Sequence, residues 1–137
     1  RDTMATEFEL SLAGPTKNLL DAIGVLSDRF INLETVATAK VGDRFVVRFI
    51  TGNDDECRAA FMKADLPFKE RNVLVLEVHN KPGQWLRAAR CLIEGGVELE
   101  GSYLLSQKDD RLRFVFGVSD YARAREIAGQ ITECSAY

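Results

Sequence analysis

The hydrophobic pattern of the sequence repeats at an offset of 66 residues, from Phe8 to Leu74, and this repeat limits the possible folds more than any other feature. Apolar residues occupy every second position over 8–12 and again over 74–78. A period of two is typical of a strand that buries one face. Each predicted strand leads into a loop that contains Gly and Pro, and then into a segment with helical spacing of apolar residues. The chain therefore carries the same structural pattern twice.

The rest of each copy consists of a second strand, a turn, a third strand and a second helix. In the first copy these elements are predicted near 31–33, 41–43, 45–49 and 54–64, and in the second near 97–99, 108–110, 112–116 and 121–133. Residues whose side chains accept hydrogen bonds stand at the starts of the two second helices and are predicted to cap them: Asn53 or Asp54, and Ser119 or Asp120. Helical spacing also predicts which residues of the first helix in the second copy face the sheet: Leu86, Ala89, Leu92 and Ile93.

The two copies differ at their ends. The first continues into a short strand near Pro67 to Arg71, whereas no clear fourth strand follows in the second before Tyr137. The order β-α-β-β-α-β, with helices on one face of an antiparallel sheet, is the ferredoxin-like plan. We therefore predict an α+β fold of two ferredoxin-like βαββαβ units in tandem, over 5–70 and 71–137. Whether the second unit has a fourth strand stays open.

Composition argues against several classes of function. The net charge is −3, whereas nucleic-acid binding requires a basic surface. No apolar run approaches the roughly 18 residues of a membrane-spanning helix. The three cysteines are far apart and form no C-x-x-C pair, so neither a disulfide framework nor a zinc site is expected, and a cytoplasmic setting fits best. No nucleophile–base pair, metal-ligand cluster or phosphate loop appears, which predicts a protein that is not an enzyme and that uses no metal or cofactor.

The third strands carry aromatic residues that alternate with arginines. An RNA-binding sheet would expose such aromatic residues, but here we expect them to face the helices. The arginines then occupy the opposite face. We interpret them as a solvated face or as a contact with a partner sheet, with an anion site as the less favoured alternative. These residues are Arg44, Arg48, Arg111 and Arg113.

The second half also contains a short motif. A strand is followed by Asn80-Lys81-Pro82-Gly83, then by a helix, and then by Gly96-Val97-Glu98-Leu99. This order resembles an ACT domain, whose pattern is a strand, an Asn/Asp-x-Pro-Gly loop, a helix and a Gly-(Val/Ile)-Asn-(Ile/Leu) entry into the second strand. The resemblance covers about Asn72 to Glu133. The first half matches in periodicity and around Asn32, and the whole chain is similar to the stand-alone tandem ACT proteins.

The resemblance implies a regulatory, allosteric module that binds an amino acid or a similar small effector at an interface between two ACT units. The loop before the first helix would supply backbone groups, and the residue that enters the second strand would supply a side chain. A homodimer is the implied assembly, and an enzyme under its control is a further candidate partner. Carried over to this sequence, the ligand-binding positions are Asn80, Lys81, Pro82, Gly83, Gln84, Trp85, Glu98 and Asn32.

Elementary chemistry is in keeping with the loop as a ligand site. Gly83 lacks Cβ and permits a close approach, and the helix that begins near Gln84 offers free N–H groups to a carboxylate. Asn80 both donates and accepts hydrogen bonds. Glu98, however, stands where the ACT pattern has Asn, and its carboxylate would repel that of a ligand. Two hypotheses follow: a composite site that uses this loop together with Asn32, or an ACT-like module that oligomerises or docks on a partner enzyme without a ligand.

Overall fold

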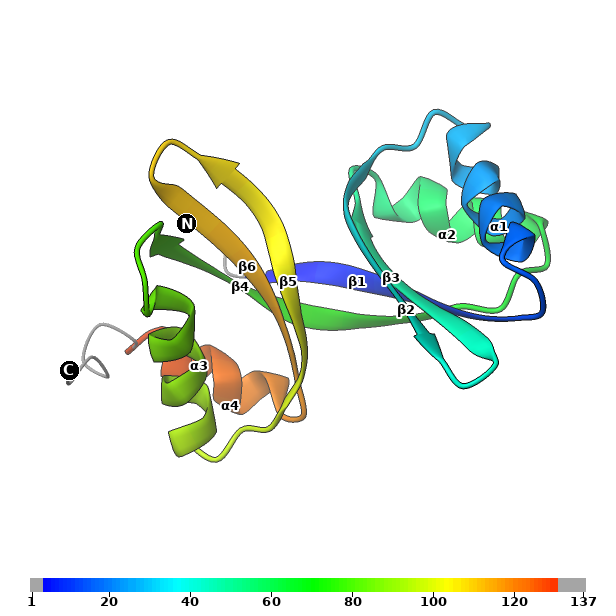
Figure 1. The fold of residues 1–137 in the computed structure, drawn as a ribbon. Helices are drawn as coiled ribbons and strands as arrows, with labels where there is room; N and C mark the ends of the chain where they lie inside the picture. Colours follow the sequence, from blue (N-terminus) through cyan, green and yellow to red (C-terminus); the bar gives the residue numbers. More distant parts are fainter. Residues whose placement is uncertain (1–3, 131–137) are drawn as a thin grey trace. The chain divides into compact units, whose positions relative to one another are not determined.

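The structure, a computed structural model of the chain, describes residues 4–130 (Figure 1). Within this range it contains strands and helices that follow one another as β1 (Met4–Ala13), α1 (Lys17–Ser27), β2 (Leu33–Val41), β3 (Arg44–Thr51), α2 (Asp54–Lys63), β4 (Lys69–His79), α3 (Gln84–Glu94), β5 (Leu99–Lys108), β6 (Arg111–Val118) and α4 (Tyr121–Ala128).

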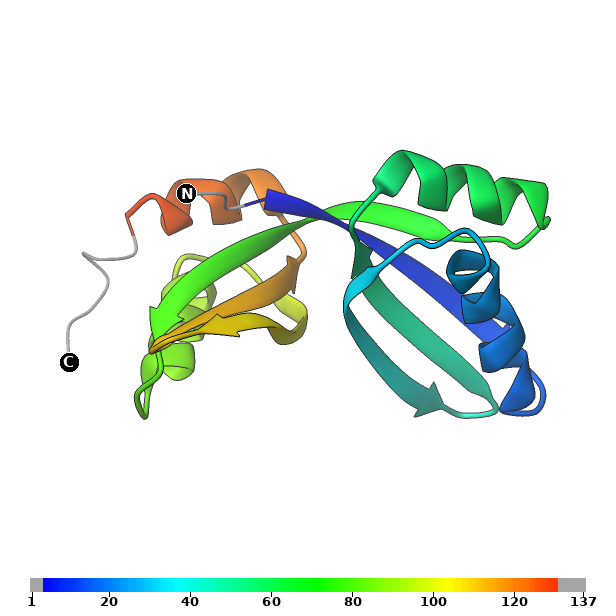
Figure 2. The same ribbon diagram turned by 90° about the horizontal axis from the view of Figure 1, so that it is seen from above.

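The chain divides into two compact units. The N-terminal unit comprises Thr6–Arg71, and the C-terminal unit comprises the chain from Asn72 onward together with Met4 and Ala5. In each unit both helices lie on one face of a layer of antiparallel strands (Figures 1 and 2). The strand order is β2-β3-β1 in the N-terminal unit and β4-β6-β5 in the C-terminal unit. The predicted α+β fold class, with ferredoxin-like units and helices on one face, is confirmed.

One strand differs from the prediction. The sequence predicts a short strand near Pro67 to Arg71 and a separate strand over 74–78, whereas β4 runs without a break over Lys69–His79. No Gly or Pro stands within this segment, so nothing in it ends the strand. The start of β4 belongs to the N-terminal unit and the remainder to the C-terminal unit. The tail in which a fourth strand of the C-terminal unit was sought lies outside the described residues.

Apolar side chains at every second position of β1 and β3 form the core of the N-terminal unit. Phe8 and Leu10 of β1 and Phe49 of β3 are fully buried in one cluster with residues of the helices. Phe61 of α2 joins this cluster, and its ring meets that of Phe49 edge-on at a centroid distance of 5.9 Å. Burial of a side chain of this size stabilises a fold by roughly 1.5–3 kcal/mol. Phe49 of β3 thus faces the helices, as the sequence predicts.

The prediction for the buried face of α3 is confirmed for Ala89 and Leu92 and is wrong for Leu86 and Ile93. Leu86 and Ile93 were expected to face the sheet, but 51% and 55% of their surfaces are exposed. The buried side chains of α3 are those of Ala88, Ala89, Cys91 and Leu92. Small residues let a helix approach a sheet closely, so the stripe with the smaller side chains packs inward. Leu86 and Ile93, seven positions apart, share one exposed stripe.

The predicted caps of α2 and α4 are confirmed. The Asn53 side chain accepts a hydrogen bond from the backbone N–H of Glu56 at 3.1 Å. The Asp120 side chain accepts one from the backbone N–H of Arg123 at 3.0 Å. Each bond satisfies an N–H group that has no partner inside its helix. The other end of α4 differs from the prediction, since the helix ends at Ala128.

Two further expectations concern cysteines and membranes. Cys57 is buried with a free thiol, whereas Cys91 takes part in a disulfide bond, which the sequence argument did not expect. The cysteines therefore no longer support a cytoplasmic setting. Among the helices of residues 4–130, none is both long and apolar enough to cross a membrane.

Candidate ligand site

The loop after β4 is held in place by its own backbone. The N–H of Asn80 donates to the carbonyl of Asp110 at 2.6 Å, and the N–H of Lys81 donates to the carbonyl of His79 at 2.9 Å. Gly83 closes the loop in the left-handed region, at φ +85°, and caps α3. A residue with a Cβ is strained in this conformation, which explains the need for Gly at this position. The side chains of Asn80 and Lys81 are exposed.

The first turn of α3 leaves backbone donors available. The N–H of Gln84 reaches the carbonyl of Lys81 at 3.3 Å, and the N–H of Arg87 reaches that of Gly83 at 2.9 Å. Between them, the N–H groups of Trp85 and Leu86 have no backbone acceptor among residues 4–130. They stand at the positive end of the helix dipole, where a carboxylate or another anion is stabilised. The start of α3 therefore presents two backbone donors directly after the loop Asn80–Gly83.

Trp85 is fixed by packing on one side and open on the other. Its ring stacks on that of Phe116, with centroids 6.0 Å apart and an interplanar angle of 18°. Its Nε1 donates to the Ser102 hydroxyl at 3.0 Å. The residue still exposes 38% of its surface. The ring thus extends the core of the C-terminal unit and forms a rigid apolar surface beside the loop.

Glu98 does not lie near this loop within the unit. Its N–H donates to the Ser119 hydroxyl at 3.1 Å, which places it beside the residue that follows β6. Asn80 is bonded to Asp110, which precedes β6. Because a strand rises about 3.4 Å per residue, the two ends of this strand are roughly 24 Å apart. A single small ligand in this unit therefore cannot contact both Asn80 and Glu98.

Asn32 occupies in the N-terminal unit the position that Glu98 occupies in the C-terminal unit. Its carbonyl accepts a hydrogen bond from the N–H of Gly52 at 3.0 Å, and its side chain is exposed. It stands at a hollow of about 320 Å³ whose walls are mostly apolar. The neighbouring Phe30 is 96% exposed, in the left-handed region at φ 59°. The hollow is lined by Ile23, Leu26, Ser27, Phe30, Ile31, Asn32 and Leu33.

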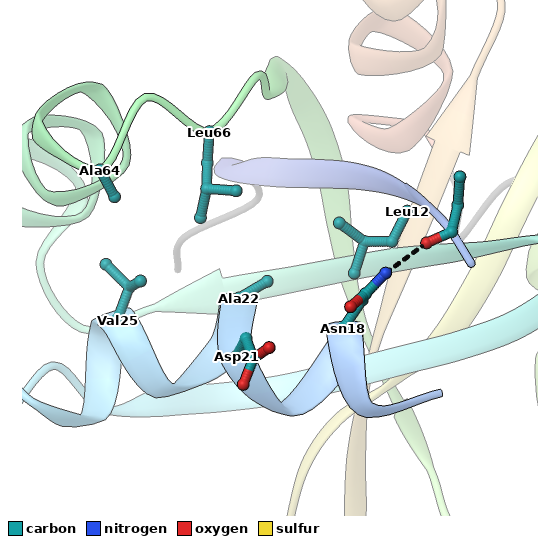
Figure 3. Close-up of a pocket in the computed structure, with 8 residues that line it drawn as sticks. Leu12, Asn18, Asp21, Ala22, Val25, Ala64 and Leu66 are labelled. Carbon is teal, nitrogen blue, oxygen red and sulfur yellow. Dashed lines mark hydrogen bonds between the residues drawn. The ribbon is translucent and has the colours of Figure 1, made fainter. Parts of the chain in front are cut away.

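A second hollow of the N-terminal unit was not predicted (Figure 3). It has a volume of about 360 Å³ and opens between the end of β1, α1 and the segment after α2. Asn18 and Asp21, three positions apart on α1, are its polar residues, and Asn18 Nδ2 donates to the Ala13 carbonyl at 2.7 Å. A largely apolar wall with a few polar groups is typical of small-molecule sites. Its residues are Leu12, Ala13, Asn18, Asp21, Ala22, Val25, Ala64 and Leu66.

The side chains of residues 4–130 that could hold a metal ion or act as a nucleophile are dispersed or buried. Among the residues described, no group of three or more His, Cys, Asp and Glu side chains is arranged to hold a metal ion. His79 is exposed, and its Nδ1 lies 3.4 Å from an oxygen of Asp110, which is more exposed still. Burial raises the pKa of the Cys57 thiol to about 12, so the thiolate that a nucleophile requires does not form near neutral pH.

No protein-family model and no curated protein matches the sequence. Solved structures do match. A protein of Bacteroides thetaiotaomicron has a TM-score of 0.85 at 20% identity, over 95% of this chain and 90% of that chain. The ligand-free regulatory subunit of aspartate kinase from Thermus thermophilus has a TM-score of 0.66 at 11% identity, over 98% and 93%. The chain shares the fold of that regulatory subunit.

A longer protein contains the same fold as one part. Escherichia coli aspartokinase III in complex with lysine and aspartate matches over 99% of this chain but 32% of that chain, with a TM-score of 0.57 at 12% identity. At such identities the likeness shows the fold alone.

Proposed function

We propose that this protein is a non-catalytic regulatory module built from a tandem pair of ACT-like domains, over 5–70 and 71–137, and that it binds a small effector, an amino acid in the first instance. The observation that carries the proposal is the start of α3, where the N–H groups of Trp85 and Leu86 lack backbone acceptors among residues 4–130. The shared fold with an aspartate kinase regulatory subunit supports a regulatory role.

An α-amino acid fits the chemistry of this loop. Its carboxylate would accept hydrogen bonds from the two N–H groups, and the positive charge of Lys81 would add to the attraction. The carbonyl oxygen of the Asn80 side chain would accept a hydrogen bond from the ammonium group. Pro82 restricts the loop and lowers the conformational entropy that is lost on binding. Gln84 and the open face of Trp85 would meet the ligand side chain.

The two strand-entry residues complete the proposal. Asn32, beside an apolar hollow, retains the amide of the ACT pattern and is proposed to hydrogen-bond an effector. Glu98 is proposed to hold an ammonium group rather than a carboxylate. Because Glu98 lies far from Asn80 within its unit, variants of the loop and of the strand entries should separate the contribution of each position.

A thermal-shift screen against the twenty amino acids tests the proposal. A ligand that binds only the folded state stabilises it by about 2.7 kcal/mol at a hundredfold excess over Kd. We expect one or two amino acids to raise the melting temperature selectively and to change the fluorescence of Trp85, the only tryptophan of the chain. Asn80→Ala should weaken this binding about tenfold, or by ~1.4 kcal/mol.

Matched variants locate the site. Asp21→Asn alters the unpredicted hollow of the N-terminal unit and should leave binding at the loop unchanged. If Asp21→Asn weakens binding and Asn80→Ala does not, the effector binds in that hollow instead. No shift with any amino acid at millimolar concentration would contradict the effector-binding proposal.

The second candidate function is docking without a ligand. The exposed side chains of Leu86 and Ile93 on α3 favour it, because a partner that covered them would bury apolar surface. A homodimer or a regulated enzyme would cover this stripe. Light scattering of the purified protein measures the assembly, and Ile93→Glu should dissociate a dimer formed through this stripe. If the protein is a monomer at all concentrations and the ligand screen is positive, docking between copies of the chain is excluded and effector binding is the only function of the two that is supported.

A further inference from the structure

A charged hollow of about 550 Å³ lies at the turn that joins β5 and β6, in the C-terminal unit. Three of its residues are cations, namely Lys108, Arg111 and Arg113, and two are carboxylates, Glu77 and Asp109. Ser106 and Gln107 add a hydroxyl and an amide. None of these residues belongs to the loop or to the strand entries of the proposed effector sites.

Among residues 4–130, the ion pairs around this hollow leave Arg113 without a carboxylate partner. In the register of β4 and β6, Glu77 stands directly opposite Arg113. Glu77 nevertheless bonds to Arg111, at 3.1 Å between Oε2 and Nη1. Arg111 also approaches Asp110 at 3.9 Å. Within the described part of the chain, Arg113 makes only a long hydrogen bond of 3.5 Å to the Ser106 hydroxyl and no ion pair.

The N-terminal unit contains a Glu–Arg pair on its first and third strands that does form an ion pair, although at a different position of the repeat. Glu9 of β1 stands opposite Arg48 of β3, and the two form an ion pair at 3.1 Å. Both pairs join the first and third strands of a unit, and both arginines are partly buried. A partly buried guanidinium without a counterion is costly, whereas one that bonds to a carboxylate is satisfied. The comparison therefore marks Arg113 as a cation that is ready for an external anion.

We propose that this hollow binds the oxyanion group of a small molecule, a phosphate or a carboxylate, with Arg113 as the main contact. The guanidinium presents parallel N–H donors that match two oxygens of either group. Lys108 adds a positive charge at the rim, and the Gln107 amide and Ser106 hydroxyl add hydrogen-bond donors. This site shares no residue with the proposed amino-acid site, although the N–H of Asn80 donates to the carbonyl of Asp110 in the turn beside it.

An NMR titration of the full chain at low ionic strength tests the proposal. Inorganic phosphate and, separately, succinate are added, and amide resonances of residues 106–113 are followed. We expect saturable shifts with at least one of the two anions, and the anion with the lower Kd identifies the preferred group. Arg113→Gln should weaken this binding about tenfold or more. The matched variant Arg48→Gln should leave the Kd unchanged.

Other outcomes overturn the proposal. Shifts that increase linearly with either anion without saturation would show screening by salt rather than a site. Equal binding by the Arg113→Gln variant and the unmodified protein would remove Arg113 from the site. Because Asn80→Ala should retain anion binding, a failed amino-acid screen leaves this experiment interpretable, and a failed anion titration leaves the amino-acid proposal unaffected.

Discussion

Gly95 at the end of α3 provides a sensitive test of packing in the C-terminal unit. Its φ of −81° suits any residue, so a substitution to Ala introduces no backbone strain. The added Cβ, however, would overlap with Ile127 Cδ1, and it would lie 3.1 Å from Ile127 Cγ1 and 3.2 Å from the Cys91 carbonyl oxygen. Ile127 is only 7% exposed and belongs to the core cluster, so its side chain has little room to move.

The change in the free energy of unfolding caused by Gly95→Ala is the sum of two opposing contributions. Overpacking of a core costs about 1–3 kcal/mol. Replacement of Gly by Ala lowers the entropy of the unfolded chain and returns about 0.4–1 kcal/mol. The midpoints of these two ranges differ by about 1.3 kcal/mol, and Gly95→Ala should lower the free energy of unfolding by about this amount. Gly24 in α1 is the matched control, because an added Cβ there meets no atom within 4 Å. Gly24→Ala should stabilise the protein by roughly 0.5–1 kcal/mol, since Ala is the better helix former.

Urea unfolding measures the free energy of unfolding of both variants. Trp85 fluorescence follows the unit that contains Gly95, and far-ultraviolet circular dichroism follows the whole chain. A double variant assigns the cause. Ile127→Val removes Cδ1 and should cost about 0.5–1.5 kcal/mol by itself. If the clash is responsible, Gly95→Ala should cost little more in the Ile127→Val background, a coupling of about 1–2 kcal/mol. Strict additivity, or a Gly95→Ala variant as stable as the unmodified protein, would refute the reasoning.

Further predictions concern the loop and the buried thiol. Gly83→Ala meets no steric clash but places Ala at φ +85°, so it should cost about 1–2 kcal/mol in urea unfolding and weaken effector binding in the same protein; unchanged stability would contradict the assigned backbone conformation. Burial raises the pKa of Cys57 from its ordinary 9.0 to about 12, so the unfolded chain loses this proton first. Below pH 9 the free energy of unfolding should be independent of this thiol, and between pH 9 and 12 it should fall by up to ~4 kcal/mol. Cys57→Ala should remove that part of the decline. An equal dependence of the free energy of unfolding on pH in both proteins would contradict the raised pKa.

The sequence by itself determined the element order and much of the local structure. A period of two placed β1 and β3, because only one face of each strand can reach the helices. The caps Asn53 and Asp120 were predictable because their hydrogen bonds span three residues and depend on no distant contact. The motif from Asn80 to Gly83 identified the loop whose left-handed Gly83 begins α3. These features follow from interactions that are local in the chain.

Only the tertiary structure decided what depends on residues far apart in the chain. Helical spacing allowed more than one apolar stripe on α3, and packing against the sheet selected the stripe of small residues and exposed Leu86. The distance between Asn80 and Glu98 follows from the length of β6, which neither motif contains. Glu77 forms its ion pair with Arg111 rather than with Arg113, which stands opposite it, and these side chains come together only when β4 and β6 pair. Sequence periodicity specifies a direction for each side chain, whereas competition among several neighbours in space decides which partner it meets.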